Sequence, residues 1–279
     1  MDWDYIANKF SSIPDRLLYH YTDVRGLEGI INNEEIWLTE YGYLNDSSEG
    51  VYGIEIFKEV LGSGVFRDYN LFRDRFDYKV DFVDLVNAIS RKEGVFCCSF
   101  TSEGNLLSQW RAYCPKEGGY SIGFSAESLK KLSKTRYFSF FRCIYKKEEQ
   151  INIGLKVINE FLYYAENTDG FSQGQFQTHL QEPVTFFASA FKNNHFREEK
   201  EWRLVYSNKF STNVCYRTKG NVINAIPYVK LPLPKNAIEE IIIGPCGNSH
   251  SAKRSLELLL KLKGMNPEIK DSGIPYRAF

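Results

Sequence analysis

The chain lacks the cysteine and histidine patterns that mark metal sites and disulfide frameworks. Its six cysteines include no C-x-x-C pair, and Cys97 and Cys98 are adjacent within an apolar run. Its four histidines show no H-E-x-x-H spacing. Cysteines of this kind are usually small core residues in a reducing compartment. We therefore expect no disulfide, no zinc site and no metal cofactor.

The chain also lacks an excess of charge of one sign and any long apolar run. Lys plus Arg and Asp plus Glu are 35 each, so the formal net charge is zero. Bulk electrostatics therefore do not favour nonspecific binding to nucleic acid or to a membrane. The start, Met1-Asp-Trp-Asp, is acidic and has no signal-peptide or membrane-span character. We expect a cytoplasmic protein without a membrane partner.

Repeats, low-complexity tracts and Pro/Gly-rich linkers are absent from the 279 residues. We therefore expect one α+β domain over residues 1–279, with helical insertions at about 49–92 and 151–194. Strand and helix patterns do not alternate regularly, which favours mixed, mainly antiparallel sheets with flanking helices. The expected strands are residues 17–21, 36–39, 95–100, 120–124, 137–145, 200–206, 214–217, 226–230, 240–243 and 268–270. Outside the insertions, helices are expected at 3–10, after 22, at 106–113 and at 251–263.

A row of charged residues stands out in the segment 196–205. Strand alternation assigns six residues to two faces: Trp202, Leu204 and Tyr206 to one, and Glu199, Glu201 and Arg203 to the other. A row of this kind beside a cleft can orient a sugar hydroxyl or stabilise a developing positive charge. Its ordinary interpretation is a solvated strand face.

Three further segments carry polar side chains at places where ligands bind. The stretch His20-Tyr-Thr22 ends a strand, and a histidine there can hydrogen-bond a ribose hydroxyl. Asn45, Asp46 and Glu49 follow the next strand and form either a turn with a helix cap or part of a ligand rim. On the helix 106–113, Arg111 can meet a phosphate. Each segment also has an ordinary structural interpretation.

Several motifs together resemble the large bacterial domain-of-unknown-function 2971 family along nearly the whole chain. The resembling pieces are Leu18-Tyr-His-Tyr-Thr22, Ile36-Trp-Leu with Leu44-Asn-Asp and Glu49, Phe96-Cys-Cys-Ser-Phe100, Leu107-Ser-Gln-Trp-Arg-Ala-Tyr113, Gly119 to Phe124, Phe191-Lys with Phe196, Glu199, Glu201, Trp202 and Arg203, Pro227-Tyr228, Ile241 to Pro245, and Ile274-Pro-Tyr-Arg277. The family name implies no activity.

Residues 18–38 also resemble the first motif of ADP-ribosyltransferases, with a His-Tyr-Thr segment, a helix and an Ile-Trp-Leu strand. The resemblance implies an ADP-ribosyltransferase-like fold and NAD as substrate. It implies a ribose-binding role for His20, a catalytic role for Glu201 or Glu199, and a place for Ser99 or Ser108 in the middle motif. The other residues assigned to NAD are Tyr21, Thr22, Tyr43, Asn45, Arg111, Tyr113 and Arg203, with Tyr43 and Tyr113 as the aromatics beside nicotinamide.

The sequence therefore leads to an NAD-dependent ADP-ribosyltransferase or NAD glycohydrolase, acting as a toxin or phage-defence effector. The acceptor is a protein, a nucleic acid or water. Two alternatives remain open. One is a non-catalytic ligand-binding or interaction module of a defence system. The other is a nuclease that binds a divalent metal through Asp46, Glu49, Glu199 and Glu201.

Overall fold

The computed structural model describes residues 16–44, 49–63, 94–133, 138–168, 173–207, 213–218 and 225–275. The chain divides into two compact units. Unit 1 comprises Met1–Ser12, Glu40–Val95 and Phe141–Glu198, and unit 2 comprises Ile13–Thr39, Phe96–Phe140 and Glu199–Phe279. Both segments expected as helical insertions lie in unit 1. The helix expected at 3–10, and residues 64–92 of the first insertion, lie outside the described residues.

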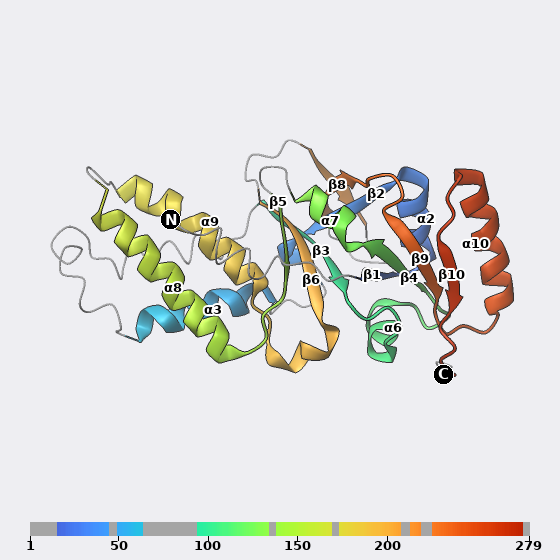
Figure 1. Ribbon diagram of the computed structural model, residues 1–279, viewed down its shortest axis with the longest axis horizontal. Coiled ribbons are helices and arrows are strands. Elements are labelled where there is room, and N and C mark those ends of the chain that lie inside the picture. The colour runs from blue at the N-terminus through green and yellow to red at the C-terminus, as the bar shows by residue number, and fades with distance from the viewer. Residues whose placement is uncertain are drawn as a thin grey trace. The chain divides into compact units, whose positions relative to one another are not determined.

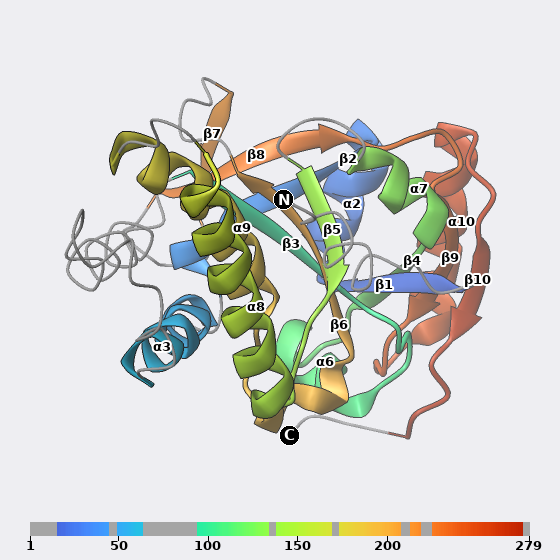
Figure 2. The ribbon, with the colours of Figure 1, turned by 60° about the vertical axis from the view of Figure 1, so that its left-hand side comes forward.

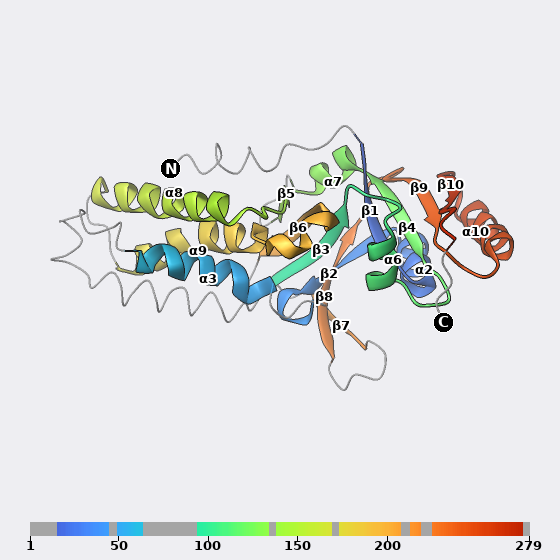
Figure 3. The same ribbon diagram turned by 90° about the horizontal axis from the view of Figure 1, so that it is seen from below.

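Unit 1 is built from helices packed lengthwise. Its long helices are α3 (Glu49–Gly62), α8 (Lys147–Glu166) and α9 (Gln173–Ala190), which lie side by side (Figure 3). At Gly53 the close approach of α3 and α9 requires glycine, because a Cβ there would lie 2.0 Å from the Ala188 carbonyl oxygen. The amide of Gln150 donates to the carbonyls of Ile144 and Lys192, at 2.5 and 2.9 Å, and so ties the start of α8 to the segment that follows α9.

The strands of the described residues form one ten-stranded sheet. They are β1 (Leu17–Thr22), β2 (Glu35–Glu40), β3 (Val95–Thr101), β4 (Tyr120–Ser125), β5 (Phe138–Arg142), β6 (Glu201–Ser207), β7 (Val214–Arg217), β8 (Ile226–Pro232), β9 (Ile238–Ile243) and β10 (Glu268–Asp271). The order is β10-β9-β4-β1-β3-β2-β8-β7, and β6 pairs with β3 and β5. The β10–β9 pair is parallel, whereas β4, β7 and β8 make antiparallel pairs.

This architecture confirms the expected α+β class with a mixed, mainly antiparallel sheet. The expected strand bounds are close to those observed, with one difference. The strand expected at 137–145 is the shorter β5, because the chain leaves the sheet after Arg142. The helix α7 (Ala126–Leu132) was not anticipated, although Ser125 caps it by accepting from the Ser128 amide.

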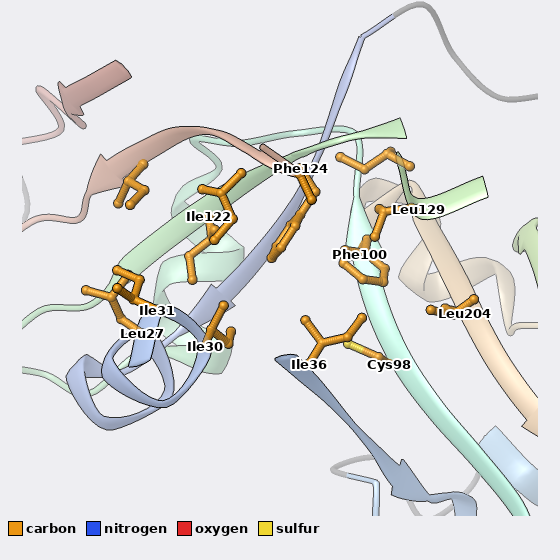
Figure 4. Packing of buried hydrophobic residues seen from close by; sticks show 14 of the residues in the cluster. Leu27, Ile30, Ile31, Ile36, Cys98, Phe100, Ile122, Phe124, Leu129 and Leu204 are labelled. Atoms are coloured by element: carbon orange, nitrogen blue, oxygen red, sulfur yellow. The ribbon is translucent and has the colours of Figure 1, made fainter. Parts of the chain in front are cut away.

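One face of the unit 2 sheet carries the main core. The helices α2 (Val24–Asn33), α7 and α10 (Ser249–Lys263) contribute apolar side chains to it, and α2 and α10 lie against the end formed by β4 and β9 (Figure 1). In the close view, Ile31 projects from α2, Ile122 projects from β4, and Phe100 and Leu129 lie close together (Figure 4). Leu18 of β1 and Leu204 of β6 belong to the same cluster.

The opposite face carries a smaller core around α6 (Leu107–Tyr113). The Trp110 ring meets the Tyr21 ring edge-on, with centroids 4.7 Å apart, and Ile242 completes this cluster. Gly244 leaves room for the indole, because a Cβ there would lie 2.7 Å from it. Strand β1 lies between β3 and β4 (Figure 2). It borders both cores because its alternate side chains face opposite sides of the sheet, with Leu18 in the main core and Tyr21 in the smaller one.

Two sequence expectations concern membranes and disulfides. Every helix in the described ranges is too short or too polar to cross a membrane. All six cysteines fall within those ranges, and they are thiols rather than disulfides.

Candidate functional site

His20 is held at the place where β1 meets β3. The two strands pair with Tyr19 opposite Thr101, and the next residue, His20, extends its ring toward the β3 backbone. Its Nδ1 lies 2.9 Å from the Ser99 carbonyl oxygen, and its ring centroid lies 5.9 Å from that of Phe100. A carbonyl only accepts, so this contact assigns the proton of the neutral ring to Nδ1. Nε2 is then a hydrogen-bond acceptor.

The environment of His20 favours the neutral imidazole. Burial lowers the pKa of His20 below its ordinary value, because removal from water disfavours the charged ring. The positive charge of Arg217 lowers this pKa further. Within the described residues Nε2 makes no hydrogen bond. The site therefore presents an unprotonated acceptor nitrogen on a fixed ring.

Arg217, at the end of β7, packs against two aromatic rings. Its guanidinium carbon lies 5.5 Å from the Trp37 ring centroid and 5.6 Å from that of Tyr228. The two rings are themselves neighbours, 4.5 Å apart and inclined by 32°. One terminal nitrogen of Arg217 donates to Thr39 Oγ1 at 2.7 Å. The aromatic faces and this hydrogen bond fix the plane of the guanidinium.

The charge of Arg217 has no carboxylate at salt-bridge distance among the described residues. Its Nε is buried and has no hydrogen-bond partner. Burial lowers the pKa of Arg217 below its ordinary value, and the charges of Cys98, Tyr228 and Asp23 act in the opposite direction. An arginine stays protonated in proteins, so the group is a partly desolvated cation with a spare donor.

Trp37 is positioned by a carboxylate on its own strand. Glu35 accepts from the indole Nε1 at 2.9 Å and forms an ion pair with Lys230 at 3.1 Å. The Lys230 ammonium lies 5.8 Å from the indole centroid. Glu35 of β2 and Lys230 of β8 therefore fix the orientation of the Trp37 ring.

The charged row of β6 is buried rather than solvated. Trp202 and Leu204 join the main core, which leaves Glu201 and Arg203 on the other face, as strand alternation predicts. Arg203 is 0% exposed and Glu201 is 5% exposed. The Arg203 Nε and a terminal nitrogen donate to the two Glu201 carboxylate oxygens at 2.7 and 2.9 Å. The two charges form a bidentate pair.

Glu199 does not belong to this row. It ends the 3₁₀ helix η2 (Asn194–Glu199), and Lys200 has a φ of +42°, so the strand begins only at Glu201. The expectation of three alternating charged residues fails there because a left-handed residue breaks the extended backbone. Glu199 is still anchored to β3, since its carbonyl accepts from Thr101 Oγ1 at 2.5 Å.

Strand β3 contacts both His20 and Glu199, but it does not bring His20 face to face with Glu201. Ser99 contacts His20, and Thr101, two residues later, contacts Glu199. That spacing corresponds to roughly 7 Å along a strand. His20 shares its face of β1 with Leu18 of the main core, whereas Glu201 points away from that core. The structure therefore does not place Glu201 across from His20.

The other residues expected at an NAD site are dispersed. Thr22 shares the face of β1 that carries His20, and Ser99 contacts His20 through its backbone carbonyl. The Tyr21 hydroxyl is engaged by Glu103 and Leu106 on the opposite face. Arg111 is exposed and Tyr113 is 37% exposed on α6, which covers that same opposite face. Tyr43 belongs to unit 1, and Asn45 lies outside the described residues.

The carboxylate set of the nuclease alternative is only partly visible. Asp46 and the side chain of Glu49 lie outside the described residues. Within those residues, no group of three or more His, Cys, Asp or Glu side chains is arranged to hold a metal ion.

Sequence inspection missed the cluster that Arg217 forms with two aromatic rings. Trp37 and Tyr228 fall within family motifs that carry no assigned role, and Arg217 lies outside every motif. They come from β2, β8 and β7, and only the strand order brings them together. A signal was present in Tyr216-Arg217, an exposed tyrosine and a charge at the end of a short strand.

Comparison with known proteins gives a family match over part of the chain and no activity. The family described as "Protein of unknown function (DUF2971)" matches residues 109–204. This confirms the resemblance to that family over a stretch that runs from α6 into β6. No curated protein matches the chain.

Proposed function

We propose that unit 2 binds NAD and that the protein is an ADP-ribosyltransferase-like enzyme. The observation that carries the proposal is His20, a neutral ring fixed by the Ser99 carbonyl with Nε2 left as an acceptor. A ribose hydroxyl is a donor that such a nitrogen would bind. The resemblance of residues 18–38 to the first motif of ADP-ribosyltransferases supports the same role.

In the proposed reaction, the bond between ribose C1′ and the nicotinamide nitrogen breaks. Its electron pair leaves with nicotinamide, which departs neutral, and an oxocarbenium-like ribose remains. An oxygen of water or of an acceptor then forms a bond to C1′ and releases its proton to a base. A carboxylate near the ribose stabilises the positive charge and holds a hydroxyl.

We assign the carboxylate role to Glu199 in preference to Glu201. Arg203 already neutralises Glu201 in a buried bidentate pair, so that carboxylate has little capacity to stabilise another cation. Glu199 is less buried than Glu201 and is anchored to β3 two residues from the His20 contact. Cytoplasmic location belongs to the same proposal, because NAD is available there and the thiols are reduced.

The binding part is tested by titrating the full chain with NAD in a calorimeter, alongside His20→Asn. Asparagine can still donate to the Ser99 carbonyl but lacks the nitrogen at the Nε2 position. We expect this variant to bind NAD about tenfold more weakly or worse, which corresponds to loss of one hydrogen bond at ~1.4 kcal/mol. His195→Asn, at an exposed histidine, is the matched control and should bind normally. Equal binding by all three proteins would refute the role of His20.

The catalytic part is tested by mass spectrometry for nicotinamide release. Glu199→Gln should abolish release while NAD binding persists, whereas Glu198→Gln, its exposed neighbour, should leave release unchanged. NAD binding without release by the wild-type chain, with every candidate acceptor supplied, would contradict the enzyme. It would favour the second candidate, a non-catalytic ligand-binding module, which the neutralised Glu201–Arg203 pair also favours.

A further inference from the structure

Helix α10 presents two leucines to water on its outer side. The helix lies beside β9 at one end of unit 2 (Figure 1) and buries Leu256 and Leu260 in the main core. Leu258 is 58% exposed, and Leu262, at 84%, is the most exposed large apolar side chain of the described residues. These two leucines are four residues apart, so they lie one above the other on the side of the helix opposite the core. Leu258 and Leu262 therefore form a leucine strip that stays in contact with water.

Positive charges flank the leucine strip. Arg254 lies four residues before Leu258 and Lys261 lies three residues after it, so both exposed cations share the outer side of the helix. In all, α10 carries four basic side chains and one carboxylate, that of Glu257. Within the described residues none of the four cations forms a salt bridge. The zero net charge of the whole chain therefore conceals a local positive excess on α10.

The leucine strip is better matched to a lipid surface than to a protein surface. A stable protein interface buries about 800 Å² on each partner, far more than two leucine side chains offer. A second copy docked symmetrically through α10 would also bring the same cations together. An anionic bilayer requires no shape complementarity. Apolar side chains insert at the boundary between headgroups and acyl chains, while neighbouring cations meet the headgroup phosphates.

We propose that α10 docks the protein on an anionic lipid surface, with Leu258 and Leu262 inserted and with Arg254 and Lys261 on the headgroups. Each cation near such a surface strengthens partitioning about fivefold. We expect weak, reversible association, on the order of 10³–10⁴ M⁻¹ in accessible lipid and no stronger than that of a single acyl chain. The inference does not depend on the proposed NAD site, because its residues belong to the outer side of α10.

The experiment is cosedimentation of the full chain with two kinds of vesicle at millimolar lipid. One kind contains phosphatidylglycerol and phosphatidylcholine in equal parts, and the other contains phosphatidylcholine alone. We expect binding to the anionic vesicles only, and loss of that binding at about 0.5 M salt, because salt screens the headgroup charge. Leu258→Ser with Leu262→Ser should weaken binding about tenfold, since two apolar side chains no longer insert. Arg254→Gln with Lys261→Gln should weaken it about 25-fold, or about fivefold for each charge.

Matched substitutions at other exposed sites are the controls. Tyr163→Ser changes an exposed tyrosine of α8, and Arg197→Gln with Lys235→Gln removes two exposed cations outside α10. Both control proteins should bind the anionic vesicles as wild type does. Thermal unfolding of every variant checks that it is folded, and the melting temperatures should be similar because the substituted side chains are exposed.

Three results would overturn the lipid surface. The first is absence of sedimentation with the anionic vesicles. The second is equal binding by wild type and by the double leucine variant, which would show that the leucine strip does not insert. The third comes from sedimentation velocity without lipid: if wild type self-associates and the double leucine variant stays monomeric, the strip is an interface between copies of this chain.

Discussion

Two arginines of unit 2 are removed from water in opposite ways. Arg203 is completely buried, and the Glu201 carboxylate meets it with two parallel hydrogen bonds. Arg217 is partly buried and packs against Trp37 and Tyr228, with no carboxylate at salt-bridge distance in the described residues. The Glu201 carboxylate neutralises Arg203 within the chain. Arg217 packs against aromatic rings and has no such carboxylate among the described residues.

The positions of the two arginines in the sheet agree with this difference. Arg203 is on β6, which has β3 and β5 as paired neighbours, and its side chain is 0% exposed. Arg217 is on β7, the last strand in the sheet order of the described residues, where β8 is its paired neighbour. An interior charge must be neutralised for the fold to be stable. A charge on an edge strand that stays partly exposed is less dependent on a partner within the chain, so we assign the larger structural role to Arg203.

The largest expected effect is on stability, when the Arg203 pair is broken. Glu201→Gln leaves a buried guanidinium without its carboxylate, and we expect the free energy of unfolding to fall by about 3–5 kcal/mol. Urea unfolding of wild type and variant measures this. Glu127→Gln removes the exposed Glu127–Lys131 pair and should cost about 0.5 kcal/mol or less.

A double variant sharpens the interpretation of that loss. Replacing the pair by Glu201→Leu with Arg203→Met removes both charges and should recover much of the stability lost in Glu201→Gln. A loss below about 1 kcal/mol in Glu201→Gln would mean that the pair is not the structural element inferred here, and would return Glu201 to the list of catalytic candidates.

The sequence predicted the elements of the sheet well, because their signals are local. Alternation placed Trp202 and Leu204 opposite Glu201 and Arg203, and β7 was expected with its observed bounds. It did not predict that the charged face is enclosed, because burial depends on what packs over a strand. It also extended the row to Glu199, since a left-handed Lys200 has no simple signature in a charged segment.

The candidate site was less predictable than the fold, because its residues are distant in the chain. His20 was expected from its own motif, and the structure adds the Ser99 carbonyl that fixes its tautomer. Arg217, Trp37 and Tyr228 meet only because β2, β8 and β7 are consecutive in the sheet. One sequence carries no register between such strands, so the contact of Arg217 with Trp37 and Tyr228 could not have been derived from it.

The next effect in size is a pH dependence of the free energy of unfolding, which arises from His20. The folded pKa of His20 lies below its ordinary value of 6.5, so below about pH 6.5 the unfolded chain binds a proton that the folded chain does not. Stability is therefore fully present above about pH 6.5 and is lost as pH falls, with a slope of up to about 1.4 kcal/mol per pH unit.

His20→Asn should lack this component of the pH dependence. Urea unfolding of ligand-free wild type and variant at about pH 7.5 and about pH 5.5 gives four free energies, and the wild type should lose about 1 kcal/mol more than the variant. Carboxylates common to both proteins cancel in the difference. Identical pH dependences would show that the His20 ring titrates as it does in the unfolded chain, and would remove the neutral acceptor from the proposed site.

The smallest expected effect is on the stability of the ligand-free protein when Arg217 is removed. Arg217→Met loses the hydrogen bond to Thr39 and the contacts with Trp37 and Tyr228, but it also relieves a desolvated charge that has no carboxylate partner among the described residues. These effects oppose each other, so the free energy of unfolding should change by about 1 kcal/mol or less. Arg203→Met, the same substitution at the neutralised arginine, strands the buried Glu201 carboxylate and should cost several times more. Urea unfolding of the two variants side by side decides the comparison. If both methionine variants lose similar free energy of unfolding, Arg217 contributes to stability as much as Arg203 does, and its unpaired Nε donor does not indicate a ligand-binding role.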